Sequence, residues 1–366
     1  MNTRGLALQG ALAVVGLVAA FLTWQREPEG MPGEISIMDI SKRSLEKVRW
    51  EDATRYVELA RNPEDEDKLW VTIAEKPKPP PPPPAMADGG VASGADGGTT
   101  PGGADGGVAS APPSSAPPAS PPVVSPVVPP PPRVLRANSN AETLWGRLAP
   151  LKGTRAIGDL DAQKREELGF VDSPRKLTLT VDGREQVVVI GSPKGLPWST
   201  PYVMREDGKV FLMVTTILPD FEGAINRLVD RRLHKFEEGD FDTLVVTQAK
   251  NSRTFSVSGK PPAPMIISPQ NTPGQQDEFV RNWHDRIWRV ASLDVLGKGE
   301  EPPGSPLEDA FRVEYRKGGK DIGFFQVVKS TQNLYYARTE LSAGWVRLPP
   351  PFQTLVTEAA KVASGS

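Results

Sequence analysis

The pattern of apolar and polar positions divides the chain into four stretches. An uncharged apolar run covers Gly5–Gln25, and a mixed stretch with short apolar segments extends from Glu34 to Glu75. Residues 76–132 contain few large apolar side chains, whereas regular alternation begins at Val134 and continues towards the C-terminus. Because such changes of pattern accompany changes of structure, the four stretches are expected to differ in structural class.

The run Gly5–Gln25 predicts one membrane-spanning helix, because about 20 apolar residues cross the hydrocarbon layer. Arg4 precedes the run, so the positive-inside rule favours a single-pass protein of the bacterial inner membrane with residues 1–4 in the cytoplasm and the bulk in the periplasm. A cleaved signal peptide is the alternative, since Val18 and Ala20 form a small-residue pattern before Phe21. The apolar run is longer than a usual signal region, which favours the retained anchor.

The stretch 26–75 is predicted to be a small β-rich segment, with strands near Tyr56–Leu59 and Leu69–Ile73. It is too short to enclose a core of its own and is expected to pack elsewhere in the chain. Residues 76–133, rich in proline, glycine and alanine, are expected to form a disordered tether. The tether is either a spacer across the periplasm or a surface-loop insertion, which costs little because closure entropy grows slowly with length.

The remaining sequence predicts two similar α+β halves, residues 134–236 and 237–366. Each half has the order helix, hairpin, hairpin, helix, which suggests an internal duplication. The clearest hairpin signal is the Asp182–Gly183 turn between two alternating segments. The expected helices are Ala141–Leu148, Asp220–Leu233, Asp277–Val290 and Phe352–Val362. Tight turns between strands imply antiparallel sheets with helices on one face, and hence an α+β fold.

Composition excludes several kinds of chemistry. The chain has no cysteine and only two histidines, so thiolate sites are excluded and the commonest general base and metal ligand are scarce. The net charge is −2, with acids and bases interspersed, which makes nucleic acid an unsuitable partner. His234 is expected to cap a helix C-terminus, and His284 to lie at the surface or its boundary. We expect no enzyme activity, no cofactor and no metal.

Four aromatic side chains make up the predicted partner surface. Trp198 and Tyr202 lie in or beside a proline-rich loop, and Tyr335 and Tyr336 occupy the corresponding strand of the second half. Exposed aromatic side chains often supply most of the binding energy of an interface. Packing of these rings into the sheets is the alternative interpretation.

Several short motifs resemble domain-of-unknown-function family 4340. They are the segment Glu167–Pro174, the hairpin after it, the segment Val189–Ser192 and the strand Pro201–Arg205. The strand around Trp70 and the apolar N-terminal run are also similar to that family. Phe170 stands where the family usually has leucine, and the tether has no counterpart.

Members of this family are similar to membrane-anchored proteins associated with gliding-motility-type ABC transporters. The resemblance implies a non-enzymatic accessory or scaffold subunit of an envelope ABC-type transport complex. Its expected partners are the inner membrane and the transporter membrane subunits or an auxiliary protein. The alternative function is a periplasmic module that grips peptidoglycan or another envelope polymer through the aromatic loop.

Overall fold

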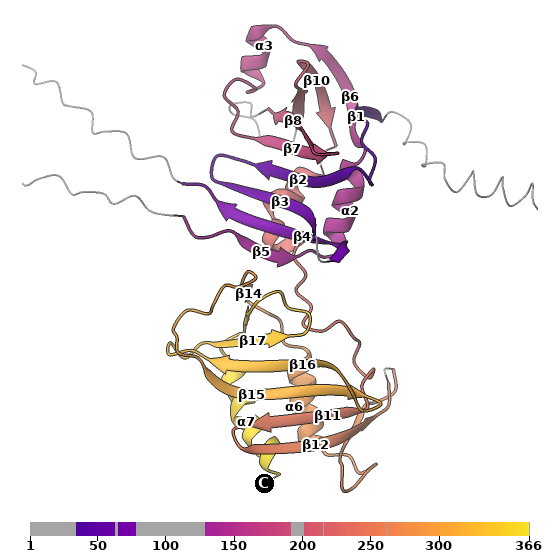
Figure 1. The fold of residues 1–366 in the computed structure, drawn as a ribbon, viewed down its shortest axis with the longest axis vertical. Helices are drawn as coiled ribbons and strands as arrows, with labels where there is room; N and C mark the ends of the chain where they lie inside the picture. Colours follow the sequence, from indigo (N-terminus) through magenta and orange to yellow (C-terminus); the bar gives the residue numbers. More distant parts are fainter. Residues whose placement is uncertain are drawn as a thin grey trace, which may run out of the picture.

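The computed structural model describes residues 34–62, 65–77, 129–191, 201–214, 216–260 and 262–365. These described residues are mostly β, with 42% strand and 19% helix, and they form two large antiparallel sheets (Figure 1). The predicted α+β class was therefore wrong. Strands that precede the tether add to the first sheet, and the predicted helix Asp220–Leu233 contains only the short helices α4 (Leu218–Glu222) and α5 (Ala224–Arg227).

The predicted membrane helix Gly5–Gln25 lies outside the described residues. Among the residues that are described, no helix is both long and apolar enough to cross a membrane. The anchor therefore stays a prediction.

The first unit, residues 34–229, contains a ten-stranded sheet in the order β1-β6-β10-β9-β8-β7-β2-β3-β4-β5. Its strands are β1 (Ile35–Met38), β2 (Leu45–Glu51), β3 (Arg55–Asn62), β4 (Asp65–Glu75), β5 (Arg133–Arg136), β6 (Leu151–Asp159), β7 (Lys176–Val181), β8 (Arg184–Ile190), β9 (Tyr202–Arg205) and β10 (Lys209–Met213). Helices α2 (Ser139–Leu148), α3 (Ala162–Glu167), α4 and α5 complete it. The predicted Asp182–Gly183 turn joins β7 to β8, and both residues have positive φ, as a tight hairpin turn requires.

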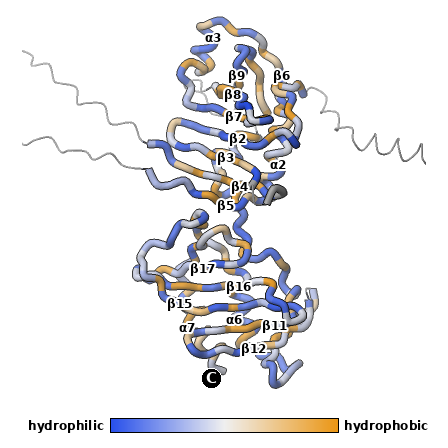
Figure 2. Tube along the Cα trace, viewed as in Figure 1, coloured by the Kyte–Doolittle hydropathy of each residue, from blue (hydrophilic) through white to orange (hydrophobic). Residues whose placement is uncertain are grey.

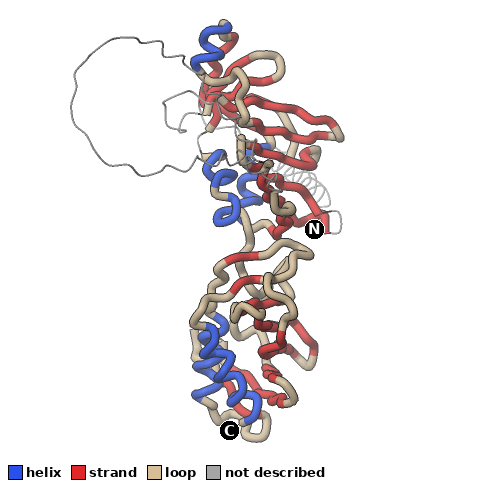
Figure 3. The backbone as a smooth tube through the Cα atoms, turned by 90° about the vertical axis from the view of Figure 1, so that its left-hand side faces the viewer, coloured by secondary structure: helices blue, strands red, loops and turns tan. Residues whose placement is uncertain are grey.

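The second unit, residues 230–365, contains an eight-stranded sheet in the order β13-β12-β11-β15-β16-β17-β18-β14. Its strands are β11 (Thr243–Gln248), β12 (Asn251–Ser258), β13 (Ile266–Pro269), β14 (Asp294–Val295), β15 (Glu308–Lys317), β16 (Lys320–Lys329), β17 (Tyr335–Thr339) and β18 (Val346–Arg347). Its helices are α6 (Glu278–Trp288) and α7 (Phe352–Ser364), and both pack on one face of the sheet (Figure 3).

The two sheets share one strand order. Without its end strands β1 and β5, the first sheet reads β4-β3-β2-β7-β8-β9-β10-β6, which matches the second sheet strand for strand. Both units have the same order along the chain. A three-stranded meander comes first, then a helix and one strand that pairs at the opposite edge of the sheet, and last a four-stranded meander. The first strands of the two meanders pair with each other, β2 with β7 and β11 with β15. The repeated unit therefore begins before the tether.

The registers and the helices of the two units match as well. The pairings make these positions equivalent: Val48 and Leu244, Leu179 and Tyr315, Val188 and Phe325, and Arg205 and Thr339. Helices α2 and α6 begin at the N-caps Asn138 and Asp277, whose side chains accept hydrogen bonds from backbone N–H groups of the first turn. Each helix buries the residues three, six, seven and ten positions after its cap.

Each sheet alternates between buried apolar and more exposed polar side chains, as the hydropathy along the strands shows (Figure 2). In β15, Val313 and Tyr315 are fully buried against the helices, whereas Arg312 and Glu314 lie on the opposite face. This alternation is expected for a sheet with one face packed against helices, which needs apolar side chains, and one face without helices, which tolerates polar side chains.

Strand β5 joins the two units. Its Leu135 is fully buried in the core of the second unit, and the Lys298 N–H donates to the Val134 carbonyl at 2.9 Å. Arg133 forms ion pairs with Asp294 at 3.3 Å and with Glu300 at 3.2 Å. The tether thus enters the fold on a strand that holds both units together.

Replacing residues 78–128 with a short Gly/Ser link should leave the thermal unfolding midpoint almost unchanged. Strands β4 and β5 pair antiparallel, with Ile73 opposite Arg133, so a short turn can connect them. As a control, Leu135→Ala should lower stability by about 2–5 kcal/mol, because it opens a cavity between β5 and the second core. A loss of many degrees in the shortened chain would contradict the prediction.

Candidate functional site

The four predicted surface aromatics do not form one surface. Tyr335 and Tyr336 are only 6% and 2% exposed, because Tyr335 packs into the main core of the second unit and Tyr336 into a small separate cluster with Leu296 and Val328. Their rings therefore offer no partner surface, and the interpretation as packed residues holds for them. Tyr202 is half-buried in β9, and Trp198 lies outside the described residues.

Both histidines also lie elsewhere than expected. His284 is fully buried on α6, not at a surface or boundary. His234 does not cap a helix, because α5 already ends at Arg227, and its side chain is only 6% exposed. Both rings belong to one aromatic cluster in the second unit, around Trp288 and Tyr315.

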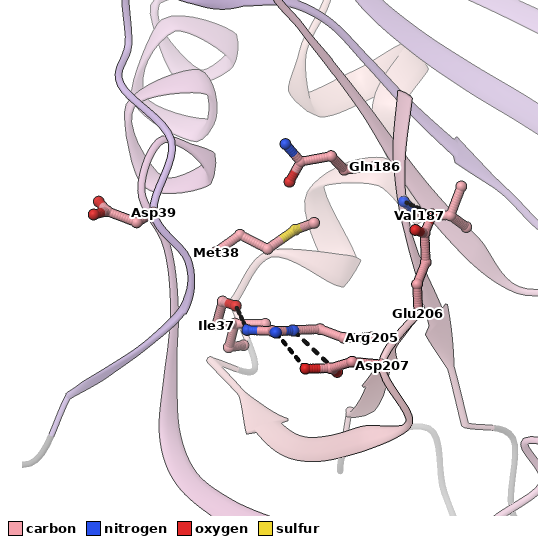
Figure 4. A pocket seen from close by; sticks show the side chains of 8 residues that line it. All are labelled: Ile37, Met38, Asp39, Gln186, Val187, Arg205, Glu206 and Asp207. Atoms are coloured by element: carbon pink, nitrogen blue, oxygen red, sulfur yellow. Dashed lines mark hydrogen bonds and ion pairs between the residues drawn. The ribbon is translucent and has the colours of Figure 1, made fainter. Parts of the chain in front are cut away.

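The first unit contains a hollow of about 360 Å³ between β1, β8 and the turn after β9 (Figure 4). Met38 points into it from β1, and Gln186 points into it from β8. Arg205 and Asp207 form its floor, and Glu206 extends along its side towards Val187. The hollow thus combines polar groups with the flexible apolar side chain of a methionine.

The charged side chains of this hollow differ in the number and kind of contacts that hold them. Arg205 pairs with Asp207 and donates to the Ile37 carbonyl at 3.1 Å, so its guanidinium is fixed to β1. Desolvation raises the pKa of Asp207, but hydrogen bonds from Lys209 N–H and Arg205 outweigh it, and the pKa lies below its ordinary value. Glu206 accepts one hydrogen bond, from Val187 N–H at 3.2 Å.

The second unit has a hollow of about 270 Å³ at the equivalent place. Lys235, the start of β16 and Glu340 line it. Glu340 follows β17 as Glu206 follows β9, and it accepts from Phe324 N–H at 3.1 Å. Phe324 and Val187 hold equivalent register positions, so the two glutamates make the same contact to the neighbouring strand.

Glu340 differs from Glu206 in having a histidine partner. The His234 Nδ1 lies 3.2 Å from both carboxylate oxygens, and Lys235 N–H donates to one of them at 3.0 Å. Burial raises the pKa of Glu340, but the hydrogen bond and charge of His234 and the Lys235 N–H outweigh it, so the pKa is lowered. The carboxylate is therefore held as an anion.

Aromatic rings surround His234 on several sides. Trp288 stacks on it with ring centres 4.9 Å apart and planes 9° apart, and Tyr315 contacts it edge-on at 5.0 Å. Gly323 makes room for the arrangement, because a Cβ there would lie 2.4 Å from Phe236 and 2.6 Å from Glu340. The flat imidazole ring of His234 thus lies between an aromatic wall and a carboxylate.

A second histidine lies deeper in this cluster. Within the described residues, neither ring nitrogen of His284 nor the Tyr315 hydroxyl has a hydrogen-bond partner. Burial, together with the charge of His234, lowers the pKa of His284 to about 3. Burial likewise raises the pKa of Tyr315 well above its ordinary value, so both side chains stay neutral at physiological pH.

Position along the chain shows what replaces His234 in the first unit. His234 lies ten residues before Leu244, and Met38 lies ten residues before the equivalent Val48. Met38 therefore lines the hollow where the second unit has a histidine. Glu206 has the position of Glu340, but no histidine, lysine or arginine in the described part of the chain pairs with it.

The sequence contains one signal for this pair of sites. The segments Tyr202–Glu206 and Tyr336–Glu340 both carry a glutamate four residues after a tyrosine. The tyrosines were predicted to form a partner surface because they are aromatic. The glutamates, in contrast, are the residues that line the two hollows. In the part of the chain that the structure describes, no three His, Asp or Glu side chains are grouped as metal ligands. The two hollows can bind charge, through carboxylates held by backbone N–H groups.

Comparisons with known proteins identify no relative. No protein-family model, curated protein or solved structure matches the chain.

Proposed function

We propose that the protein is a membrane-anchored, non-enzymatic accessory or scaffold subunit of an envelope ABC-type transport complex. The observation that carries this proposal is the shared orientation of the two sheets. In both units the helices lie on the same side of the strands, so two helix-free sheet faces are turned to one side (Figure 3). Such a long double face suits contact with an extended or multi-subunit partner.

The side chains on these faces favour a protein partner over a sugar polymer. Binding of a sugar ring needs an open aromatic face, but Arg49 covers the ring of Tyr56 at 3.9 Å. In the second unit, Arg312 covers Phe324 at 4.4 Å. Peptidoglycan binding through these rings would first require both arginines to move.

The choice of a transport complex rests on sequence. The apolar run Gly5–Gln25 supplies the inner-membrane anchor with the bulk in the periplasm. The resemblance to domain-of-unknown-function family 4340 supplies the partner class, the membrane subunits of a gliding-motility-type ABC transporter or an auxiliary protein.

A charged, bulky residue on either helix-free face should reduce recovery of transporter subunits with the full-length protein from native membranes. Thr178→Arg in β7 and Thr254→Arg in β12 test one face each, since Thr178 lies between the fully buried Leu177 and Leu179, and Thr254 precedes the fully buried Phe255. We expect about a tenfold loss, because an uncomplemented charge at an interface centre is costly. Glu278→Arg on the helix side is the matched control and should change nothing.

Co-purification of the wild-type protein with sacculi, without any transporter subunit, would contradict the proposal and favour the envelope-binding alternative. Equal recovery from all three variants would show that neither face is the contact. Thermal melts of each variant separate a lost contact from a lost fold.

A further inference from the structure

We propose that the hollow of the first unit is a binding site for a positively charged side chain of a partner polypeptide, with Glu206 as the acceptor. The second unit contains the internal precedent. There, the Glu340 carboxylate lies 3.2 Å from the His234 Nδ1, beside the start of β16. The equivalent carboxylate of the first unit has kept the backbone contact, and no histidine, lysine or arginine among the described residues pairs with it.

The first unit cannot supply this cation from its own equivalent position. By its spacing along the chain Met38 corresponds to His234, and a methionine side chain carries no charge. The stacking partner is missing as well, because Ala149 occupies the position of Trp288, eleven residues after the helix cap. The hollow of about 360 Å³ beside Glu206 thus has Met38 on its wall, whereas the second unit, whose own hollow is about 270 Å³, has His234 packed on Trp288 beside Glu340.

Arg205 does not take the place of the missing partner. Its guanidinium is directed to Asp207 and to the Ile37 carbonyl on the floor of the hollow (Figure 4). The lining residues include three carboxylates (Asp39, Glu206 and Asp207) and one guanidinium, and the Asp39 carboxylate is directed away from the hollow (Figure 4). The charged groups that remain at the hollow, Glu206, Asp207 and Arg205, have a formal balance of −1. The hollow therefore attracts cations and repels anions.

The position of β1 favours a polypeptide as the source of the charge. Among the strands that the structure describes, β1 is an end strand paired only with β6, and it forms one wall of the hollow. An extended segment lying along such an edge can hydrogen-bond to the backbone and direct alternate side chains into a neighbouring pocket. Met38 and Gln186 offer adaptable contacts to the apolar stem of an arginine or lysine.

A titration of the full-length protein in detergent tests the site without any transporter component. The probes are two fluorescently labelled peptides of serine, threonine and valine, one with a central arginine and one with a central citrulline. Citrulline has nearly the same shape as arginine and no charge. Fluorescence anisotropy should show about three- to tenfold tighter binding of the arginine peptide, as expected for a partly exposed ion pair.

Two variants locate the effect. Glu206→Gln should remove the preference for arginine over citrulline, because the amide keeps the shape and loses the charge. Met38→His should weaken both peptides, because it supplies an internal partner and fills the hollow. Glu278→Gln, an exposed carboxylate on α6, is the control and should keep the preference.

Equal affinity for the two peptides, or a preference that survives Glu206→Gln, would overturn the site. These outcomes are independent of the transport role, which is tested by co-purification alone. A positive titration with no transporter subunit recovered would leave the site standing and remove the proposed function.

Discussion

Between pH 7 and pH 5 the free energy of unfolding of the wild-type protein should fall by about 2 kcal/mol because of His284, and the variant His284→Phe should not show this fall. The folded protein keeps this ring neutral, with its pKa lowered to about 3 by burial and by the charge of His234. The unfolded chain binds a proton near pH 6.5. Below that pH the unfolded state therefore holds one more proton than the folded state, and stability falls as the pH falls.

Urea denaturation of wild type and variant at pH 7 and pH 5 measures the effect. Phenylalanine keeps a planar ring and removes two nitrogens that have no hydrogen-bond partner among the described residues, so the variant should also be at least as stable at pH 7. Trp145 holds the equivalent position on α2, so Trp145→Phe is the matched control for ring replacement and should leave the pH dependence intact. An unchanged pH dependence in His284→Phe would show that the ring is solvated or paired in solution.

Glu340→Gln should lower the free energy of unfolding by about 3–5 kcal/mol, whereas Glu206→Gln should change it by no more than about 1 kcal/mol. The two glutamates hold equivalent positions and both accept from a strand N–H. They differ in burial and partner, since the Glu340 side chain is only 11% exposed and faces His234. Removing its charge weakens the contact with the buried His234 ring and disturbs two backbone hydrogen bonds.

Equilibrium unfolding at pH 7 of both variants measures the contrast between the two units. Similar small changes in both would mean that the His234–Glu340 pair contributes no net stability. Similar large changes in both would mean that Glu206 is also buried against a partner group.

Local signals predicted much of the second unit and less of the first. The Asp182–Gly183 turn, the amphipathic helix near Asp277 and the closing helix near Phe352 are all present, because each depends on neighbours in the chain. The pairing of β2 with β7 joins residues about 130 positions apart, across the tether, and no local pattern predicts such a pairing. The fold class was misassigned for this reason.

The sequence did not predict the candidate site, for a different reason. A glutamate after a strand is common, and its meaning here depends on a backbone N–H of the next strand and on a histidine more than 100 residues away. Aromatic side chains were easier to single out, but Tyr335 and Tyr336 belong to the packed interior. Only alignment of the two sheets by register shows that Glu206 and Glu340 correspond.

The shared strand order has a consequence for folding, because a chain with two copies of one topology can assemble them incorrectly. The early meander of one unit could pair with the late meander of the other, β2 with β15, and trap the chain. Differences in side-chain size oppose this exchange. Leu179 stands where the second unit has Tyr315, and Ala149 stands where it has Trp288. A hybrid of the two units would contain voids or overlaps, and this mismatch directs each meander to its own partner.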